Sequence, residues 1–392
     1  MCINGNEAVA HGARLAKPGV ISAYPITPQT VIVERLSEFV GNGELNSQYI
    51  KVESEHTALA AAFGASATGV RPFTATSSQG LFYMQEMLHY VSGARVPVVM
   101  AVVNRAASPP WTIFLDHQDT IQARDTGWIQ LYVENAQEAL DTTIQAFKIA
   151  EDPSILTPVM VCLDAFIVSH TSELVDVPEQ EIVDSFLPDY NPEFLLDIEK
   201  PLTLCVGTPP NLYMEFKVRQ QRAINRSIEK IKTVTKEFEK TFGRHYNYTG
   251  VLEQYGPADA ETVLIAVGSL CGTIKEAVDE LNQEGYKVAL LRIRCYRPFP
   301  VIELIESLKG VKSLGVFDRD LSFGYEGAIC TDVKGAIYGK LNPLPQVINY
   351  VGGLGGRDVT INEIKSIYLN LLGKEDFPRE EKSKTRFVGL RR

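Results

Sequence analysis

The alternation of apolar and polar stretches along residues 1–170 predicts strands that are each followed by a helix. Residues 96–103 are almost continuously apolar, as expected for a parallel strand that is covered on both faces. After Pro28, in contrast, Val31, Leu36 and Val40 recur at a spacing that places them on one face of a helix. The predicted strands are 20–24, 49–52, 72–76, 96–103 and 157–163, and the predicted helices begin at Pro28 and cover 57–68, 80–92 and 133–150. This order is typical of a doubly wound α/β domain.

The pattern changes after about residue 170. Residues 175–202 hold several Pro, Asp and Glu and show little periodicity, so we interpret them as an extended linker. Residues 212–243 follow as one long amphipathic helix, with Ile224, Ile228 and Ile231 on one face and Gly243 as its C-cap. A second α/β unit has predicted strands at 263–267, 287–292, 313–317 and 346–350, a helix at 273–284 and a turn at 297–300.

These changes predict four segments. They are a domain at 1–170, the linker with the long helix at 171–255, a second domain at 256–372 and a charged C-terminal arm at 373–392. A chain of 392 residues is too long for one ordinary core, which agrees with two or three domains. The arm is poorly periodic, and we expect it either to be disordered or to dock on another subunit.

The charge and the hydropathy of the chain exclude two classes of partner. The formal net charge is -10, whereas nucleic-acid binding needs clustered Lys and Arg. No stretch approaches the roughly 20 apolar residues of a membrane span, and residues 1–10 lack the pattern of a secretory signal. We therefore expect a cytoplasmic protein that binds neither nucleic acid nor membrane.

The cysteines and histidines are too dispersed to predict a metal site or an iron–sulfur cluster within this chain. The cysteines stand at positions 2, 162, 205, 271, 295 and 330, and no two of them form a C-x-x-C pair. We interpret them as separate small core residues. Asp116, His117 and Asp119 look like metal ligands at first sight, but we interpret His117 as a hydrogen-bonding or packing residue and predict no metal.

Six stretches carry a resemblance when they are read together and in order. They are Tyr-Pro-Ile-Thr-Pro at 24–28, Val-Glu-Ser-Glu-His at 52–56, Phe-Thr-Ala-Thr-Ser-Ser-Gln-Gly at 73–80, Asn104-Arg105 with the polar segments at 116–119 and 124–128, Tyr-Arg-Pro-Phe-Pro at 296–300, and Gly-Gly-Leu-Gly-Gly-Arg-Asp at 352–358. This set resembles the α subunit of pyruvate:ferredoxin oxidoreductase and its 2-oxoacid relatives, over nearly the whole chain.

The resemblance implies a fold and a division of labour. The fold is α/β, with a doubly wound pyrimidine-type domain for thiamine diphosphate plus a transketolase C-terminal-like α/β domain. Thiamine diphosphate is then shared with a β subunit that carries the diphosphate and Mg²⁺ site, and 4Fe–4S clusters lie on partner subunits. Ferredoxin-like and γ-type subunits, the 2-oxoacid, coenzyme A and ferredoxin are the further implied partners. The Gly-Asp-Gly…Asn motif that binds Mg²⁺ and diphosphate in thiamine enzymes is absent from this sequence.

Glu55 is the candidate acid. Thiamine chemistry uses the cofactor as an electron sink, and it needs a carboxylic acid beside the pyrimidine ring that can hold a proton at neutral pH, which burial favours. The resemblance places the family's activating glutamate at Glu55, which follows a predicted strand where open α/β sheets bind ligands. Glu53, two residues earlier on a strand, points to the same face of the sheet as Glu55, so periodicity alone does not decide which of the two glutamates is the acid. The alternative is that Glu55 only stabilises the N-terminus of the next helix.

Thr27 and Arg105 are the candidates for binding the substrate carboxylate. Arg offers two parallel donors to a carboxylate, and Arg105 follows the most buried predicted strand. The resemblance places the family's substrate-binding Thr and Arg at these positions, and Pro25 and Ile26 beside the cofactor. The alternatives are a surface salt bridge for Arg105 and a helix N-cap for Thr27.

Three loops are harder to assign. The loop 108–114 contains a double proline and Trp111, departs from the family pattern and follows Arg105, so it either shapes the substrate pocket or packs at a subunit boundary. The glycine-rich stretch 352–356 lacks the Lys of a phosphate-binding loop, and we interpret it as a turn at a domain or subunit contact. Residues 268–272 precede a predicted helix and could bind an anion, although a structural turn is the default.

The combined prediction is a subunit that catalyses oxidative decarboxylation of a 2-oxoacid, with coenzyme A, to acyl-CoA, CO₂ and reduced ferredoxin. Pyruvate is the expected substrate, and 2-oxoisovalerate, 2-oxoglutarate, oxalate and aryl 2-oxoacids are the alternatives. An oxalate-type relative would be expected to have an Arg where Thr27 stands, which favours a monocarboxylate. A non-catalytic scaffold and a complete transketolase-like enzyme are the alternative classes, and the missing Mg²⁺ motif argues against the latter.

Overall fold

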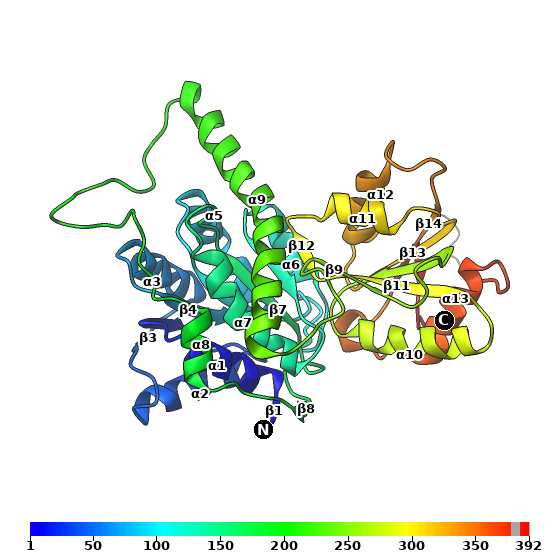
Figure 1. The fold of residues 1–392 in the computed structure, drawn as a ribbon, viewed down its shortest axis with the longest axis horizontal. Coiled ribbons are helices and arrows are strands. Elements are labelled where there is room, and N and C mark those ends of the chain that lie inside the picture. Colours follow the sequence, from blue (N-terminus) through cyan, green and yellow to red (C-terminus); the bar gives the residue numbers. More distant parts are fainter. Residues whose placement is uncertain (378–384, 392) are drawn as a thin grey trace.

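The computed structural model describes residues 1–377 and 385–391. Two large sheets lie next to each other, each with helices on its faces, and the long helix α9 (Pro210–Phe242) runs beside the first of them (Figure 1). No helix in the described ranges is both long enough and apolar enough to cross a membrane.

The first sheet has seven strands within the described part of the chain, in the order β12-β6-β7-β5-β4-β2-β3. Its strands are β2 (Val20–Ala23), β3 (Gln48–Lys51), β4 (Pro72–Thr76), β5 (Val99–Asn104), β6 (Ile129–Tyr132), β7 (Val159–Asp164) and β12 (Cys295–Arg297). All neighbours are parallel except β12, which pairs antiparallel with β6. The residues of β4, β5, β6 and β7 are buried throughout, as expected for strands covered on both faces.

The helices of this unit form two layers. One layer contains α1 (Gly5–Leu15), α2 (Thr30–Gly41) and α7 (Ala136–Ala150), and the other contains α3 (Glu55–Ala67), α4 (Ser78–Tyr83), α5 (Gln85–Gly93) and α6 (Gln118–Gln122), followed by the short 3-10 helix η1 (Ala123–Asp125). Crossovers between parallel strands are right-handed. The step from β2 to β3 and the step from β4 to β5 run in opposite directions along the sheet, so α2 and α4 lie on opposite faces. The strand order therefore reverses between β2 and β4, which are neighbours.

The second sheet has six strands within the described residues, in the order β15-β14-β13-β10-β11-β9. They are β9 (Leu252–Tyr255), β10 (Thr262–Ala266), β11 (Val288–Ile293), β13 (Ser313–Asp318), β14 (Gln346–Val351) and β15 (Thr385–Phe387). The helices α10 (Leu270–Gln283) and α13 (Ile361–Leu371) pack together on one face, and α11 (Val301–Ser307) and α12 (Ala328–Ile337) on the other (Figure 1). The short 3-10 helix η2 (Leu354–Gly356) follows β14.

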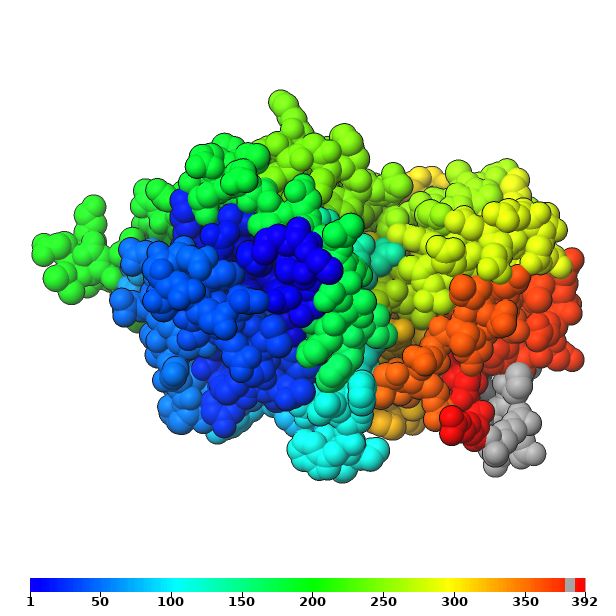
Figure 2. All heavy atoms as spheres, turned by 90° about the horizontal axis from the view of Figure 1, so that it is seen from below, coloured from blue at the N-terminus to red at the C-terminus, as the bar shows by residue number. Residues whose placement is uncertain are grey.

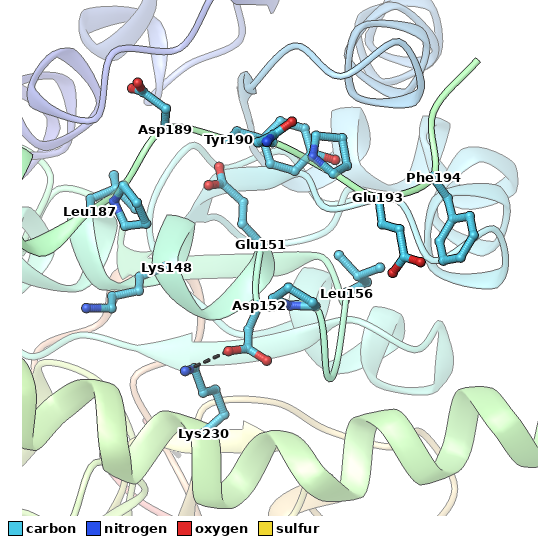
Figure 3. Close-up of a pocket in the computed structure, with 14 residues that line it drawn as sticks. Lys148, Glu151, Asp152, Leu156, Leu187, Asp189, Tyr190, Glu193, Phe194 and Lys230 are labelled. Carbon is cyan, nitrogen blue, oxygen red and sulfur yellow. Dashed lines mark ion pairs between the residues drawn. The ribbon is translucent and has the colours of Figure 1, made fainter. Parts of the chain in front are cut away.

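The segment between the units wraps around the first one. β8 (Ser172–Leu174) pairs with β1 (Cys2–Asn4) at the N-terminus, and α8 (Gln180–Phe186) packs on α9. Residues 187–194 then line a cavity of about 340 Å³ together with Lys148, Glu151 and Leu156 and with Lys230 of α9, which pairs with Asp152 at 2.6 Å (Figure 3). The first turns of α9 project from the body, with Leu212, Tyr213, Met214 and Phe216 exposed (Figure 1).

Buried charges join the two units. Glu138 of α7 accepts hydrogen bonds from Arg292 of β11 at 2.5 Å and from Arg294 at 3.1 Å. All three side chains are almost fully buried. Burial alone raises the pKa of Glu138, but the two guanidinium groups hold it below its usual value. Breaking such a pair is costly, because it leaves an uncompensated buried charge, so these contacts fix the second unit on the first.

Several element predictions are confirmed and others are wrong. The strands at 72–76 and 313–317 and the long helix match within a few residues, and Gly243 ends the helix in the left-handed conformation with φ 67°. The helix expected to begin at Pro28 begins at Thr30. The helix expected at 80–92 is two helices separated at Met84. The helix expected at 133–150 begins only at Ala136, where Asn135 caps it by accepting from the amide of Glu138 at 2.9 Å.

Three corrections come from pairing over long sequence distances. Cys295–Arg297, next to the expected turn at 297–300, is strand β12 of the first sheet. Within the segment interpreted as linker, Gln180–Phe186 is helical. In the predicted arm, Thr385–Phe387 pairs with β14 of its own chain, so this part is neither disordered nor free to dock elsewhere; residues 378–384 and 392 lie outside the described residues. Cys2 and Cys205 are exposed, while the other four cysteines are buried as expected.

Candidate active site at the carboxyl ends of β2 and β4

The loops that follow β2 and β4 meet where the strand order reverses. Open α/β sheets bind ligands at this point, because the two loops diverge to opposite faces and leave a crevice between them. The loop after β2 is Tyr24–Pro-Ile-Thr27, and the turn after β4 contains Ser77, Ser78 and Gln79. Arg105 follows β5, the strand next to β4. Thr27 and Arg105 therefore lie with the Ser77–Gln79 turn at the carboxyl ends of these strands, and Glu55 follows β3, the parallel neighbour of β2.

Glu55 is the first residue of α3 and only 8% exposed. Ser54 is the N-cap, and its hydroxyl accepts the amide of Thr57 at 3.2 Å. Within the part of the chain that the structure describes, no group donates a hydrogen bond to the Glu55 carboxylate. Glu53, in contrast, is exposed and accepts a hydrogen bond from the Thr57 hydroxyl at 3.1 Å. The rival carboxylates, which periodicity left equivalent, thus have different environments, and Glu55 is the buried one.

Gly80 brings α4 against Glu55. A Cβ at this position would lie 2.4 Å from the Thr76 hydroxyl and 2.8 Å from Oε1 of Glu55. Both distances are far below van der Waals contact, so only glycine allows the approach. The Thr76 hydroxyl is buried and has no hydrogen-bond partner among the described residues.

Arg105 connects the two loops. Its side chain donates to the carbonyl oxygen of Thr27 at 2.8 Å and to Oε1 of Gln79 at 2.8 Å. Arg105 is 5% exposed, and its Nε has no partner among the described residues. Burial lowers the pKa of Arg105, an effect that the nearby carboxylate of Asp119 opposes. Since a guanidinium has five N–H donors, three remain for another group.

Asp119 holds the backbone on both sides of this contact. Its Oδ2 accepts the amides of Ser78 and Arg105, each at 3.0 Å. Its Oδ1 accepts the Asn104 side chain at 2.8 Å and the Thr120 amide at 2.7 Å. Asp119 is fully buried, and burial raises its pKa although these hydrogen bonds oppose the increase. Ser78 has φ 45°, a strained conformation for a residue other than glycine, which the Asp119 contact stabilises.

The sequence did not predict this role for Asp119. In the sequence, Asp119 stood out only because the segment 116–119 looks like a set of metal ligands at first sight. The described residues contain no group of three or more His, Cys, Asp or Glu side chains that could hold a metal ion. His117 instead bonds through Nε2 to Asp164 at 2.9 Å, which confirms its interpretation as a hydrogen-bonding residue. A strained Ser78 and a distant carboxylate that bonds to its amide leave no local signal in the sequence.

Residues 11–237 match the family described as pyruvate flavodoxin/ferredoxin oxidoreductase, thiamine diphosphate-binding. Residues 260–364 match the core domain II of pyruvate:ferredoxin oxidoreductase. This chain belongs to the pyruvate:ferredoxin oxidoreductase family. The resemblance that the sequence motifs suggested is therefore confirmed.

The relatives within the family differ in the 2-oxoacid that their names give. Pyruvate synthase subunit PorA of Methanocaldococcus jannaschii is 49% identical over 391 residues, which are 99% of this chain and 97% of the relative. Ketoisovalerate oxidoreductase subunit VorA of Pyrococcus abyssi is 48% identical over 366 residues, covering 93% and 91% of the two chains. Identity alone therefore does not distinguish between these two substrates.

A solved structure confirms the fold. The 2-oxoglutarate:ferredoxin oxidoreductase of Magnetococcus marinus superposes with a TM-score of 0.71 at 21% identity, covering 95% of this chain and 65% of its own. A split-gene transketolase superposes with a TM-score of 0.54 at 14% identity. The predicted α/β class, with folds of the thiamine-dependent type, is thus confirmed.

The residues at this edge suit the thiamine diphosphate that the family binds. Glu55 has a buried carboxylate without a partner among the described residues, and Arg105 keeps three donors. Thr27 and Pro25 are exposed and Ile26 is half-buried, so the structure places them at an open face of this chain. The cavity in Figure 3 lies elsewhere. Its lining residues between 148 and 156 precede the first residue of β7, so the cavity lies at the amino-terminal ends of the strands and the candidate site at their carboxyl ends.

The glycine-containing turns at 268–272 and 352–356, both in the second unit, contact the first unit. Ser269 donates its amide to Asp164 at 2.9 Å and its hydroxyl at 2.5 Å, so the turn expected as a possible anion site binds a carboxylate of the same chain. Burial alone raises the pKa of Asp164, but His117, Arg319 and Ser269 hold it well below its usual value. The turn 352–356 also lies at a contact between the units, as predicted, because Gly356 donates its amide to the carbonyl of Leu115 at 2.7 Å.

Proposed function

We propose that this chain is the α subunit of a 2-oxoacid:ferredoxin oxidoreductase. The reaction converts a 2-oxoacid and coenzyme A to acyl-CoA and CO₂, and passes two electrons to two molecules of oxidised ferredoxin. Pyruvate is the preferred substrate of this proposal, with 2-oxoisovalerate next, because the similar relatives carry these two names. The observation that carries the proposal is that Glu55 and Arg105 both approach the Gln79–Gly80 turn, next to the point where the strand order of a thiamine-type sheet reverses.

Each residue has a proposed task at its own atoms. Bound thiamine diphosphate supplies a carbanion and then an electron sink for decarboxylation. Glu55 holds and returns a proton at its carboxylate, which suits a buried acid without a partner in its chain. Arg105 binds the substrate carboxylate through its remaining donors. The exposed side chain of Thr27 takes part in binding the substrate, and the carbonyl oxygen of Thr27 fixes the guanidinium of Arg105. Pro25 and Ile26 form part of the wall beside the cofactor.

The site requires a second subunit. Tyr24, Pro25 and Thr27 are exposed in this chain, although a cofactor site must exclude water. The sequence lacks the Mg²⁺–diphosphate motif and closely spaced cysteines. We therefore assign the diphosphate and Mg²⁺ to a β subunit, 4Fe–4S clusters to the β and ferredoxin-like subunits, and a further place in the assembly to a γ-type subunit.

The test is co-expression of this chain with its β-type and ferredoxin-like partners, followed by 2-oxoacid-dependent dye reduction in the purified complex. A panel of pyruvate, 2-oxoisovalerate, 2-oxoglutarate, oxalate and an aryl 2-oxoacid gives the substrate. We expect coenzyme A-dependent activity that is highest with pyruvate or 2-oxoisovalerate. Calorimetric titration of the isolated chain with thiamine diphosphate and Mg²⁺ is the second arm, and we expect no tight binding. No activity with any 2-oxoacid contradicts the reaction, and tight binding to the isolated chain contradicts the shared site.

A further inference from the structure

We propose that Gly356 is a positioning residue for the 2-oxoacid pocket, because it holds loop 106–115, which adjoins Arg105, in the conformation that receives the substrate. The inference rests on the proposed function. It assigns to the second unit, which supplies none of the candidate catalytic residues, a direct part in substrate binding.

Loop 106–115 begins immediately after Arg105 and is closed at its base. The amide of Ala106 donates to the carbonyl of Phe114 at 2.9 Å, and the hydroxyl of Ser78 donates to the carbonyl of Ala106 at 2.8 Å. The base of the loop is thus tied to the same Ser78 turn that Asp119 and Arg105 organise. Figure 2 shows the loop, in cyan, protruding where the blue-to-green half of the molecule meets the orange and red half.

The tip of this loop presents apolar side chains. Trp111 is 77% exposed, and Ile113 next to the tip and Phe114 at the base of the loop are also exposed. Large apolar side chains at the end of an active-site strand are suited to cover the apolar substituent of a 2-oxoacid whose carboxylate is held by Arg105. The position of the tip is therefore expected to affect the affinity for the substrate.

The second unit supports the loop through the backbone of Gly356. The amide of Gly356 donates to the carbonyl of Leu115 at 2.7 Å. Gly356 has φ 77°, and a Cβ on it would lie 2.4 Å from Cβ of Phe114. The contacted atom is adjacent to the loop backbone, so a rotamer change cannot relieve the overlap. Any other residue at 356 has to displace the loop by about 1 Å, and a displacement of that size in an active site can reduce catalysis on the order of 100-fold.

The displacement is expected to act on the loop more than on the catalytic groups. Arg105 is fixed separately by its bonds to Thr27 and Gln79 and through Asp119. A change at Gly356 therefore increases KM for the 2-oxoacid and leaves the affinity of the complex for thiamine diphosphate as it was. A purely structural role would reduce the assembled, cofactor-loaded enzyme without a selective change in KM.

The first experiment compares Gly356→Ala with Gly373→Ala in the assembled complex. Gly373 has φ 69° and open space around its Cβ position, so its variant has the backbone strain without the contact to the loop. We expect an increase in KM for the 2-oxoacid of about tenfold or more for Gly356→Ala, and kinetics like the wild type for Gly373→Ala. An unchanged KM for Gly356→Ala overturns the inference, as does an equal increase for Gly373→Ala.

A second experiment needs no substitution, in case Gly356→Ala does not assemble. The chain has two tryptophans, Trp111 in the loop and the fully buried Trp128. This chain, produced with 5-fluorotryptophan and assembled with unlabelled partners, gives one ¹⁹F resonance from each. We expect the 2-oxoacid, added without coenzyme A or electron acceptor, to shift the Trp111 resonance and to leave Trp128 in place. A Trp111 resonance that does not respond overturns the inference.

The two levels of the proposal fail differently. If the wild-type complex oxidises no 2-oxoacid, the proposed function fails. If the wild-type complex is active and Gly356→Ala has the same KM, the proposed function stands and only the role of Gly356 is refuted.

Discussion

Replacement of Asp119 by asparagine tests how the site is held together. The Asp119 carboxylate accepts four hydrogen bonds, two at each oxygen. Asparagine has nearly the same shape but keeps one accepting oxygen, so either the pair of amides from Ser78 and Arg105 or the pair of donors from Asn104 and Thr120 loses its acceptor. A buried donor without an acceptor costs about 1–3 kcal/mol, and the two together cost about 2–6 kcal/mol.

Part of this cost is expected to appear in catalysis, since the amides concerned position Arg105 and the Ser78–Gln79 turn. If only about 1.4 kcal/mol affects the productive conformation of Arg105, kcat/KM for the 2-oxoacid decreases about tenfold. The assay is steady-state dye reduction by the assembled complex, together with its thermal midpoint. Asp116→Asn is the matched control, because Asp116 is a neighbouring buried acid that accepts one hydrogen bond, from the amide of Gln118. Equal kcat/KM for wild type and Asp119→Asn, or equal losses for both variants, refutes the reasoning.

Two further predictions concern stability. Burial, with the nearby charge of Asp119, raises the pKa of Asp116 from 3.8 to about 7. Between these two pH values the folded chain keeps a proton on Asp116 that the unfolded chain has lost. Asp116 therefore makes the free energy of unfolding decrease as the pH rises from 3.8 to about 7. Asp116→Asn removes this decrease, which thermal midpoints at several pH values check; a slope equal to that of the wild type contradicts it. Glu138→Gln leaves the buried Arg294 without the carboxylate it pairs with, while Arg292 keeps Glu134 and Glu253. We expect the free energy of unfolding to decrease by about 3–5 kcal/mol; a denaturation midpoint equal to that of the wild type contradicts this second prediction.

The parts of the fold that depend on local sequence could be predicted from it. The parallel strands of the first sheet are continuous apolar runs, because both faces are buried. The long helix is readable because one face is apolar over its length and Gly243 adopts the φ of 67° that favours glycine. The motif assignment also favoured Glu55 over Glu53, and of these two only Glu55, the first residue of α3, is buried in the structure.

The missed features depend on contacts between residues far apart in the chain. β12 and β15 are three-residue strands, and only their partners β6 and β14 define them. The role of Asp119 depends on amides 41 and 14 residues away in the chain. The glycine-rich stretch 352–356 suggested a turn at a domain or subunit contact, but the contact that requires Gly356 is made with Phe114 of the first unit, far away in the sequence. Periodicity contains no information about such pairings.

The most direct test of the central claim is the rate at which deuterium replaces the C2 proton of thiamine diphosphate bound to the assembled complex. This rate measures activation of the cofactor and does not depend on the substrate or the electron acceptor. We predict that Glu55→Gln slows the exchange by about 100-fold or more, as expected for loss of an acid–base group, while the control Glu53→Gln exchanges at the wild-type rate. Exchange at the wild-type rate in Glu55→Gln, with the cofactor bound, would contradict the assignment of Glu55 as the activating acid.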